Sequence, residues 1–81
     1  MSVRPLVLWV SRQGWTLRMG ERTPEEVRGV IHTPQGERRF RYLRGPRVLH
    51  LDDQVIRLDP HGWEVDEQGQ IVFRSRREDV E

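Results

Sequence analysis

Residues 27–42 read VRGVIHTPQGERRFRY, and the four residues at the centre, Thr33-Pro34-Gln35-Gly36, decide the fold. They combine a short side chain that carries an oxygen, a residue that accepts the αR conformation, then Gln or His, then Gly. This pattern predicts a type I turn closed by a left-handed glycine, which commonly joins two antiparallel strands. It recurs at three further places: Ser11–Gly14, Asp59–Gly62 and Asp66–Gly69. We therefore expect antiparallel strands joined by tight turns.

Eight short strands are predicted around these turns, at residues 3–10, 15–19, 27–32, 37–43, 47–51, 54–58, 63–66 and 70–75. Alanine, the best helix former, is absent from the chain, which also favours strands. Only residues 23–26 carry a helix start signal, and β-branched residues follow at once, so at most one helical turn is expected. Eight strands with apolar residues on both faces need closure or a partner. We predict an all-β fold: a small antiparallel meander that forms a barrel or split barrel.

The alternation of apolar and polar residues predicts how the strands pair, because register follows the buried face. A four-residue loop at Thr33–Gly36 sets Gly29 opposite Phe40, where the aromatic ring shields the bare backbone. The other loops give these pairs: Val10 with Trp15, Leu58 with Trp63, Val65 with Ile71, and Trp63 with Phe73. Residues 6–17 also resemble residues 54–65. Either all hairpins share such a pattern, or one hairpin has been duplicated.

Length and composition set limits on the class of protein. With 81 residues there is room for one core, so residues 1–75 are expected to form one β domain and residues 76–81 a charged tail. Cysteine is absent, so no disulfide compensates for the small core, and self-association as a homodimer is expected to help. The longest apolar run, Leu6–Val10, is too short for a signal peptide or a membrane span, which favours a cytoplasmic location.

Catalysis and cofactor binding find little support in the sequence. No serine lies in a nucleophile elbow, there is no cysteine or lysine nucleophile, and no glycine-rich phosphate loop occurs. A metal site would have to use His50, Asp52, Asp53, Asp59 and His61, but their spacing matches no known ligand pattern. We predict a protein that is not an enzyme and has no cofactor.

A basic stretch is the clearest candidate for binding a ligand. Its five arginines, interleaved with Phe40 and Tyr42, are Arg38, Arg39, Arg41, Arg44 and Arg47. Single-strand nucleic-acid binders combine such a positive surface with aromatic rings on which bases stack. Two alternatives stay open. Neighbouring acidic residues would offset the charge, and G/C-rich codon usage would favour arginine, which supplies all 14 basic residues of a chain whose net charge is only +1.

A second candidate is a set of apolar residues that the predicted registers place on the outer face of the sheet. Aromatic residues are enriched in interface cores, and large exposed apolar patches usually have a function. The predicted contact surface consists of Val7, Trp9, Val55 and Val72. A closed barrel would bury most of these side chains instead. The leading hypothesis is a non-enzymatic interaction module that docks on itself or on another protein, and the alternative is a protein that binds single-stranded nucleic acid.

Overall fold

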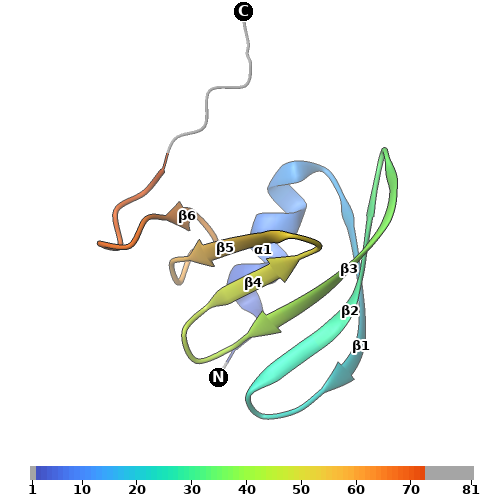
Figure 1. Cartoon of the computed structure of the whole chain (residues 1–81), viewed down its shortest axis with the longest axis horizontal. Coiled ribbons are helices and arrows are strands. Elements are labelled where there is room, and N and C mark those ends of the chain that lie inside the picture. The colour runs from blue at the N-terminus through green and yellow to red at the C-terminus, as the bar shows by residue number, and fades with distance from the viewer. Residues whose placement is uncertain (1, 73–81) are drawn as a thin grey trace, which may run out of the picture.

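The structure is a computed structural model and describes residues 2–72. One helix, α1 (Arg4–Gln13), comes first, and every later element is a strand (Figure 1). The strands are β1 (Thr16–Arg22), β2 (Glu26–Thr33), β3 (Gly36–Leu43), β4 (Val48–Leu51), β5 (Gln54–Leu58) and β6 (Glu64–Val65). Each strand pairs antiparallel with the next, so the strand order in the sheet is the chain order.

The antiparallel meander is confirmed, but the strand count and the closure differ from the prediction. Six strands form one sheet where eight were expected, and this sheet is not closed into a barrel. The first predicted strand is a helix, and the last is a single bridge between Val65 and Ile71. That bridge has the predicted register, whereas Phe73 and the predicted tail, 76–81, lie outside the described residues.

Residues 3–10 were predicted as a strand, and this was wrong because their apolar residues also have helical spacing. Leu6, Trp9 and Val10 lie at positions i, i+3 and i+4, and all three are buried. Pro5 occupies the first turn of α1, where its missing N–H costs nothing. Gly14 ends the helix in the left-handed conformation, with φ 78°. The predicted pairing of Val10 with Trp15 is therefore absent, and so is a duplicated hairpin.

The turns follow the predicted glycine pattern more closely than the predicted loop lengths. Gly29 does pair with Phe40, as expected. Leu58, however, pairs with Glu64 rather than Trp63. The loop is one residue longer because the Asp59 carboxylate accepts hydrogen bonds from the amides of His61 and Trp63, at 2.8 and 2.9 Å.

The predicted helical turn at residues 23–26 is instead the tight turn between β1 and β2. The Thr23 hydroxyl accepts a hydrogen bond from the Glu26 amide at 3.0 Å, as a helix cap would. The Thr23 amide also donates to the Glu26 carbonyl at 2.8 Å, and Glu26 then begins β2. The capping chemistry is therefore present, but the chain reverses direction instead of continuing as a helix.

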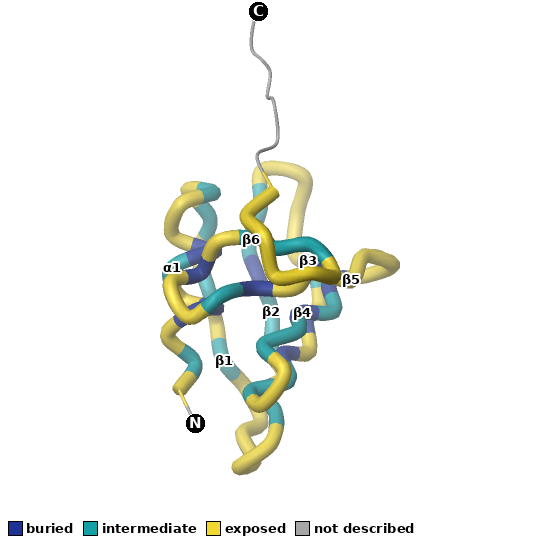
Figure 2. The backbone as a smooth tube through the Cα atoms, turned by 90° about the vertical axis from the view of Figure 1, so that its left-hand side faces the viewer, coloured by how far each residue is buried: buried dark blue, intermediate teal, exposed yellow. Residues whose placement is uncertain are grey.

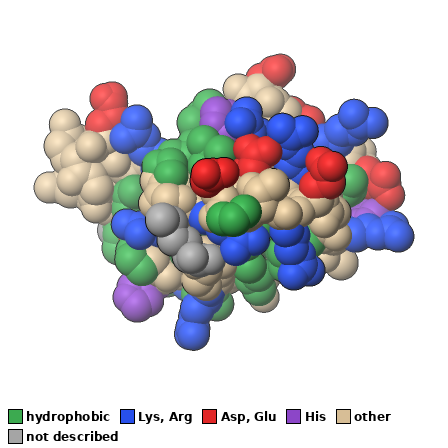
Figure 3. All heavy atoms as spheres, turned by 90° about the horizontal axis from the view of Figure 1, so that it is seen from below, with side chains coloured by type: hydrophobic (Ala, Val, Ile, Leu, Met, Phe, Trp, Pro, Cys, Tyr) green, Lys and Arg blue, Asp and Glu red, His purple; other side chains and the backbone are tan. Residues whose placement is uncertain are grey.

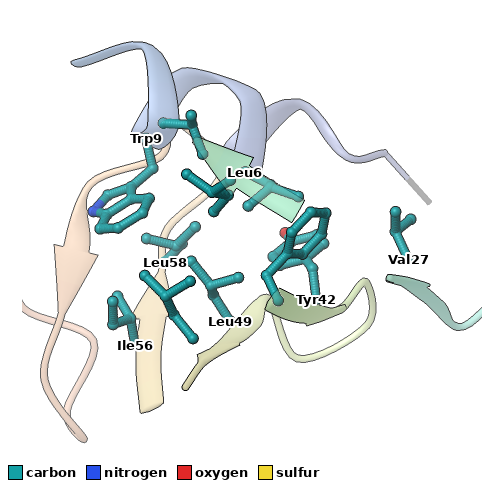
Figure 4. Close-up of a cluster of buried hydrophobic side chains, with 11 residues drawn as sticks. Leu6, Trp9, Val27, Tyr42, Leu49, Ile56 and Leu58 are labelled. Carbon is teal, nitrogen blue, oxygen red and sulfur yellow. The ribbon is translucent and has the colours of Figure 1, made fainter. Parts of the chain in front are cut away.

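The core lies between α1 and one face of the sheet (Figure 1). In Figure 2 the buried positions gather where the helix and the strands face each other. The buried hydrophobic residues are Leu6, Trp9, Val10, Val27, Ile31, Phe40, Tyr42, Leu49, Leu51, Ile56 and Leu58 (Figure 4). Successive members of this set on each strand are two residues apart, except on β2, where Val27 and Ile31 are four apart, and this even spacing is typical of a strand with one buried face. The side chains of the residues directly before and after each buried residue on a strand point to the other face. Among the described residues, no helix is both long and apolar enough to cross a membrane.

Candidate nucleic-acid interface

The sheet face that α1 leaves uncovered carries a row of side chains across four neighbouring strands. Arg28 of β2 pairs with Arg41 of β3, Arg41 pairs with His50 of β4, and His50 pairs with Val55 of β5. Along its strand, each of these residues is followed or preceded by a buried residue, so its own side chain points away from α1. Opposite residues of antiparallel strands have Cα atoms about 5 Å apart, so the four side chains form one continuous surface.

A second row runs beside the first on the same face. It consists of Arg18 of β1, Val30 of β2 and Arg39 of β3, which are paired in that order. Arg39 lies two residues from Arg41 along β3, so their side chains begin about 7 Å apart. We call the four cations of the two rows the arginine face: Arg18, Arg28, Arg39 and Arg41. All four are exposed.

Glu26, which lies on the same face, partly neutralises two members of the arginine face. Glu26 accepts a hydrogen bond from Nε of Arg28 at 2.8 Å and one from Nε of Arg41 at 2.6 Å. These two arginines would otherwise repel each other across the strand pair. The hydrogen bond from Arg41, helped by the one from Arg28, holds the pKa of the Glu26 carboxyl below its usual value. The arginine face therefore keeps a net positive charge and is held in place by Glu26.

The surface between the two rows is slightly hollowed. A shallow depression of about 480 Å³ is lined by Arg28, Gly29, Arg39, Phe40, Arg41, His50 and Asp52. The only acid in this lining, Asp52, is bonded by Arg38 at 2.8 Å. Seen from below in Figure 3, basic and acidic side chains are intermixed, in line with the net charge of +1. On the open sheet face, the arginines lie beside the acidic residues Glu26 and Glu37 of the same two strands.

The structure divides the predicted basic stretch into three parts. Arg39 and Arg41 belong to the arginine face, whereas Arg38 lies on the other side of β3, in register with the buried Ile31. Arg44 and Arg47 lie in the loop between β3 and β4. The five arginines therefore do not form one patch.

The aromatic part of that prediction was wrong. Phe40 and Tyr42 are 4% and 0% exposed, because they point into the core between α1 and the sheet. Bases could not stack on either ring while the protein is folded. The registers that place Phe40 and Tyr42 in the core also place Arg39 and Arg41 outside.

Two members of the arginine face, Arg18 and Arg28, were missed in the sequence. The signal was available for Arg28, because the predicted pairing of Gly29 with Phe40 also sets Arg28 opposite Arg41. Arg18 was harder to find. Its position depends on the register between β1 and β2, and the sequence predicted no register for this pair of strands.

The predicted apolar contact surface is not one surface. Trp9 is only 5% exposed, and its indole N–H donates to the Glu64 carboxylate at 3.0 Å, so its placement on an outer face was wrong. Val7 is exposed on α1, whereas Val55 is exposed on the uncovered face of the sheet, the opposite side of the molecule. Val72 is exposed next to β6. Self-association through another surface stays a prediction.

The candidate metal ligands do not gather in the part of the chain that the structure describes. Between residues 2 and 72, no three His, Asp or Glu side chains lie close enough together to hold a metal ion. Asp59 organises its own loop, and Asp52 is bonded to Arg38. Asp52 and Asp59 therefore have structural roles in the two loops that contain them.

Comparison with known proteins adds no further evidence: no protein-family model, no curated protein and no solved structure matches this chain.

Proposed function

We propose that this protein binds single-stranded nucleic acid through the arginine face. The observation that carries the proposal is the row that runs from Arg28 through Arg41 and His50 to Val55 over four strands that no other part of the described chain covers. Arginine is well suited to this role because its planar guanidinium binds phosphate through two parallel hydrogen bonds.

The spacing of the arginines fits a flexible phosphate chain. The side chains begin about 5 to 7 Å apart in two directions on the sheet, so one extended strand can contact several of them at once. A single strand lies on an open sheet more readily than a duplex does, because no described element protrudes from this face to enter a groove. Val30, Val55 and His50 add flat, partly apolar surface for the bases.

Because Phe40 and Tyr42 are buried, binding has to come mainly from phosphate contacts. Such binding is weakly selective for sequence and falls steeply as salt rises, because each neutralised phosphate releases counterions. For single strands the slope of log K against log salt is about −0.7 per phosphate, so three contacts predict a slope of about −2. A slope of about −2 distinguishes phosphate binding from docking on an apolar surface, whose affinity should hardly change with salt.

The test is a fluorescence-anisotropy titration of a mixed-sequence single-stranded oligonucleotide at low and at moderate salt. The variant Arg39→Gln/Arg41→Gln should bind about tenfold more weakly at low salt. Because it loses two phosphate contacts, its slope of log K against log salt should be less negative by about 1.4. The matched control is Arg12→Gln/Arg22→Gln, which removes the same charge from α1 and from the helix-covered side of β1. It should weaken binding by less than about threefold. Equal losses in the two double variants would contradict the proposal.

A further inference from the structure

The sheet has one long edge that no described strand covers. β1 is the first strand in the sheet order, so only one of its two sides is paired, with β2 (Figure 1). The other end of the sheet is β6, which has two residues and forms a bridge with Ile71. Alternate residues of an edge strand turn their N–H and C=O groups outward, where these groups can pair with another strand. β1 is therefore the part of the described chain best suited to adding a strand.

The first half of β1 is regular and carries apolar side chains on one face. Residues 16–19 pair one to one with β2, and the register is interrupted only after Met19. Trp15, Leu17 and Met19 pack against the core but are only partly buried. Trp15 also contacts Trp9 of α1 edge to face, with ring centroids 5.7 Å apart. Edge strands that avoid pairing often place charged side chains at such inward positions, so this edge leaves one side of the core open to a partner.

A second copy of the same strand fits this edge in one register. An antiparallel pair centred on Leu17 sets Trp15 opposite Met19 of the second copy, and Met19 opposite Trp15, so these partly buried side chains cover each other. On the other face the same register sets Arg18 opposite Thr16. A register centred on Arg18 would bring two like charges together, and one centred on Met19 would run into the irregular part of β1. One centred on Thr16 would set Met19 opposite the end of α1.

The symmetry of this pairing determines which faces of the two copies meet. Two copies of one edge strand pair antiparallel about a twofold axis that is perpendicular to the sheet. Both α1 helices then lie on one side of the joined sheet, and both arginine faces lie on the other. The pairing therefore covers apolar residues beside α1 and leaves Arg28, Arg39 and Arg41 uncovered, so the inference does not depend on what these arginines bind.

We infer that a second copy of this chain pairs with β1 through residues 15–19, with Leu17 of one copy opposite Leu17 of the other. The identity of the partner follows from the fit of this strand to itself, in its apolar residues and in its charges. Only a short stretch of each copy takes part, so the dimer should be weak, with a Kd of about 10–100 μM.

The first test uses introduced cysteines, because the natural chain has none and a disulfide can then form only between copies. In the inferred dimer the two Cα atoms of residue 17 are about 5 Å apart, within the range of a disulfide. Those of residue 19 are about 13 Å apart, because each lies opposite residue 15 instead. In a thiol–disulfide redox buffer, Leu17→Cys should form at least about tenfold more covalent dimer than the control Met19→Cys. Equal amounts in the two variants would overturn the inference.

The second test measures the mass of the whole natural chain by sedimentation equilibrium, over a concentration range of about 5–500 μM. The mass should rise with concentration from that of one chain toward that of two. A mass that stays at one chain over the whole range would overturn the inference, whatever the result of nucleic-acid titrations.

Charge substitutions on the exposed face of β1 test the register by the same measurement. Thr16→Arg should raise the Kd about tenfold, because the twofold axis repeats its repulsion with Arg18 in two pairs. Thr16→Arg/Arg18→Glu sets opposite charges in the same pairs and should return the Kd to within about threefold of the natural value. The control Gln54→Arg adds the same charge on β5, near the other end of the sheet, and should leave the Kd unchanged. A dimer that Thr16→Arg does not weaken, or a loss that Arg18→Glu does not restore, would contradict the pairing centred on Leu17.

Discussion

The two faces of the sheet are built by the same strands, yet they have opposite properties. On β3, Phe40 and Tyr42 are almost fully buried, whereas their neighbours Arg39 and Arg41 are exposed. The difference comes from α1, which covers one face, while no described element covers the other. The covered face therefore stabilises the fold, and the uncovered face is free to carry charge. Substitutions on the two faces should have separable effects, on stability for one face and on binding for the other.

The largest effect should come from Trp9, the aromatic residue of α1 that packs on the covered face. Trp9→Ala should destabilise the protein by about 3–5 kcal/mol, because it leaves a large cavity and removes the donor to Glu64. Trp63→Ala, at a side chain that is 44% exposed, should cost about 1 kcal/mol or less. Chemical denaturation monitored by circular dichroism measures both. If Trp9→Ala does not fold, Trp9→Phe gives a smaller and measurable loss. Equal losses at the two tryptophans would mean that α1 does not cover this face.

The next effect tests how closely the β5–β6 loop approaches α1. A Cβ atom at Gly62 would lie 2.6 Å from the Pro5 carbonyl oxygen, and the φ of +81° already disfavours a side chain. Gly62→Ala should therefore cost about 3 kcal/mol. Gly14→Ala is the matched control, since its φ is +78° but nothing lies within 4 Å of the added atom. It should cost only about 1 kcal/mol, and a Gly62 value no larger than this would contradict the described packing.

On the uncovered face, removing the carboxylate that binds Arg28 and Arg41 should sharpen the difference in function. Glu26→Gln should bind single-stranded oligonucleotide about threefold more tightly at low salt, because Arg28 and Arg41 lose their anionic partner. The gain should shrink as salt is raised. The control Glu67→Gln removes the same charge from the exposed turn after β6, which is not part of the arginine face, and should change affinity less. Anisotropy titration measures all three proteins, and weaker binding by Glu26→Gln would argue against the arginine face.

The smallest effect is a pH dependence that comes from Glu26. Because its pKa in the folded protein is below the usual 4.5, ionised Glu26 stabilises the fold above about pH 4.5. This stabilisation is lost as the pH falls from 4.5 through the lower, folded value. The difference in thermal midpoint between the natural chain and Glu26→Gln should be constant from pH 7 to about 5 and should shrink below that. A difference that grows on acidification would contradict the two hydrogen bonds from arginine.

The sequence predicted the turns well because their chemistry is local. At Gly14, Gly62 and Gly69, φ is positive, and each amide donates to the carbonyl three residues earlier at 2.9–3.0 Å. What the pattern did not reveal is the element before the turn. Ser11–Gly14 ends a helix, whereas Asp59–Gly62 follows a strand, although both have the same last-turn hydrogen bond. The spacing of Leu6, Trp9 and Val10 distinguishes the two cases, but five consecutive apolar residues satisfy strand alternation as well.

The candidate site was only partly predictable for a related reason. Alternation on β3 was enough to place Arg39 and Arg41 on one face. It could not add Arg18, because the register between β1 and β2, which is interrupted between Met19 and Arg22, was not predicted.

The most direct test of the arginine face is to observe its side chains while nucleic acid binds. The Nε–Hε resonances of arginine are followed by NMR as a single-stranded oligonucleotide is titrated into the natural chain at low salt. We expect the signals of Arg28, Arg39 and Arg41 to shift together and saturate, while those of Arg12 and Arg22 stay in place. Saturable shifts at Arg12 and Arg22, with the signals of the arginine face unchanged, would contradict binding at this face.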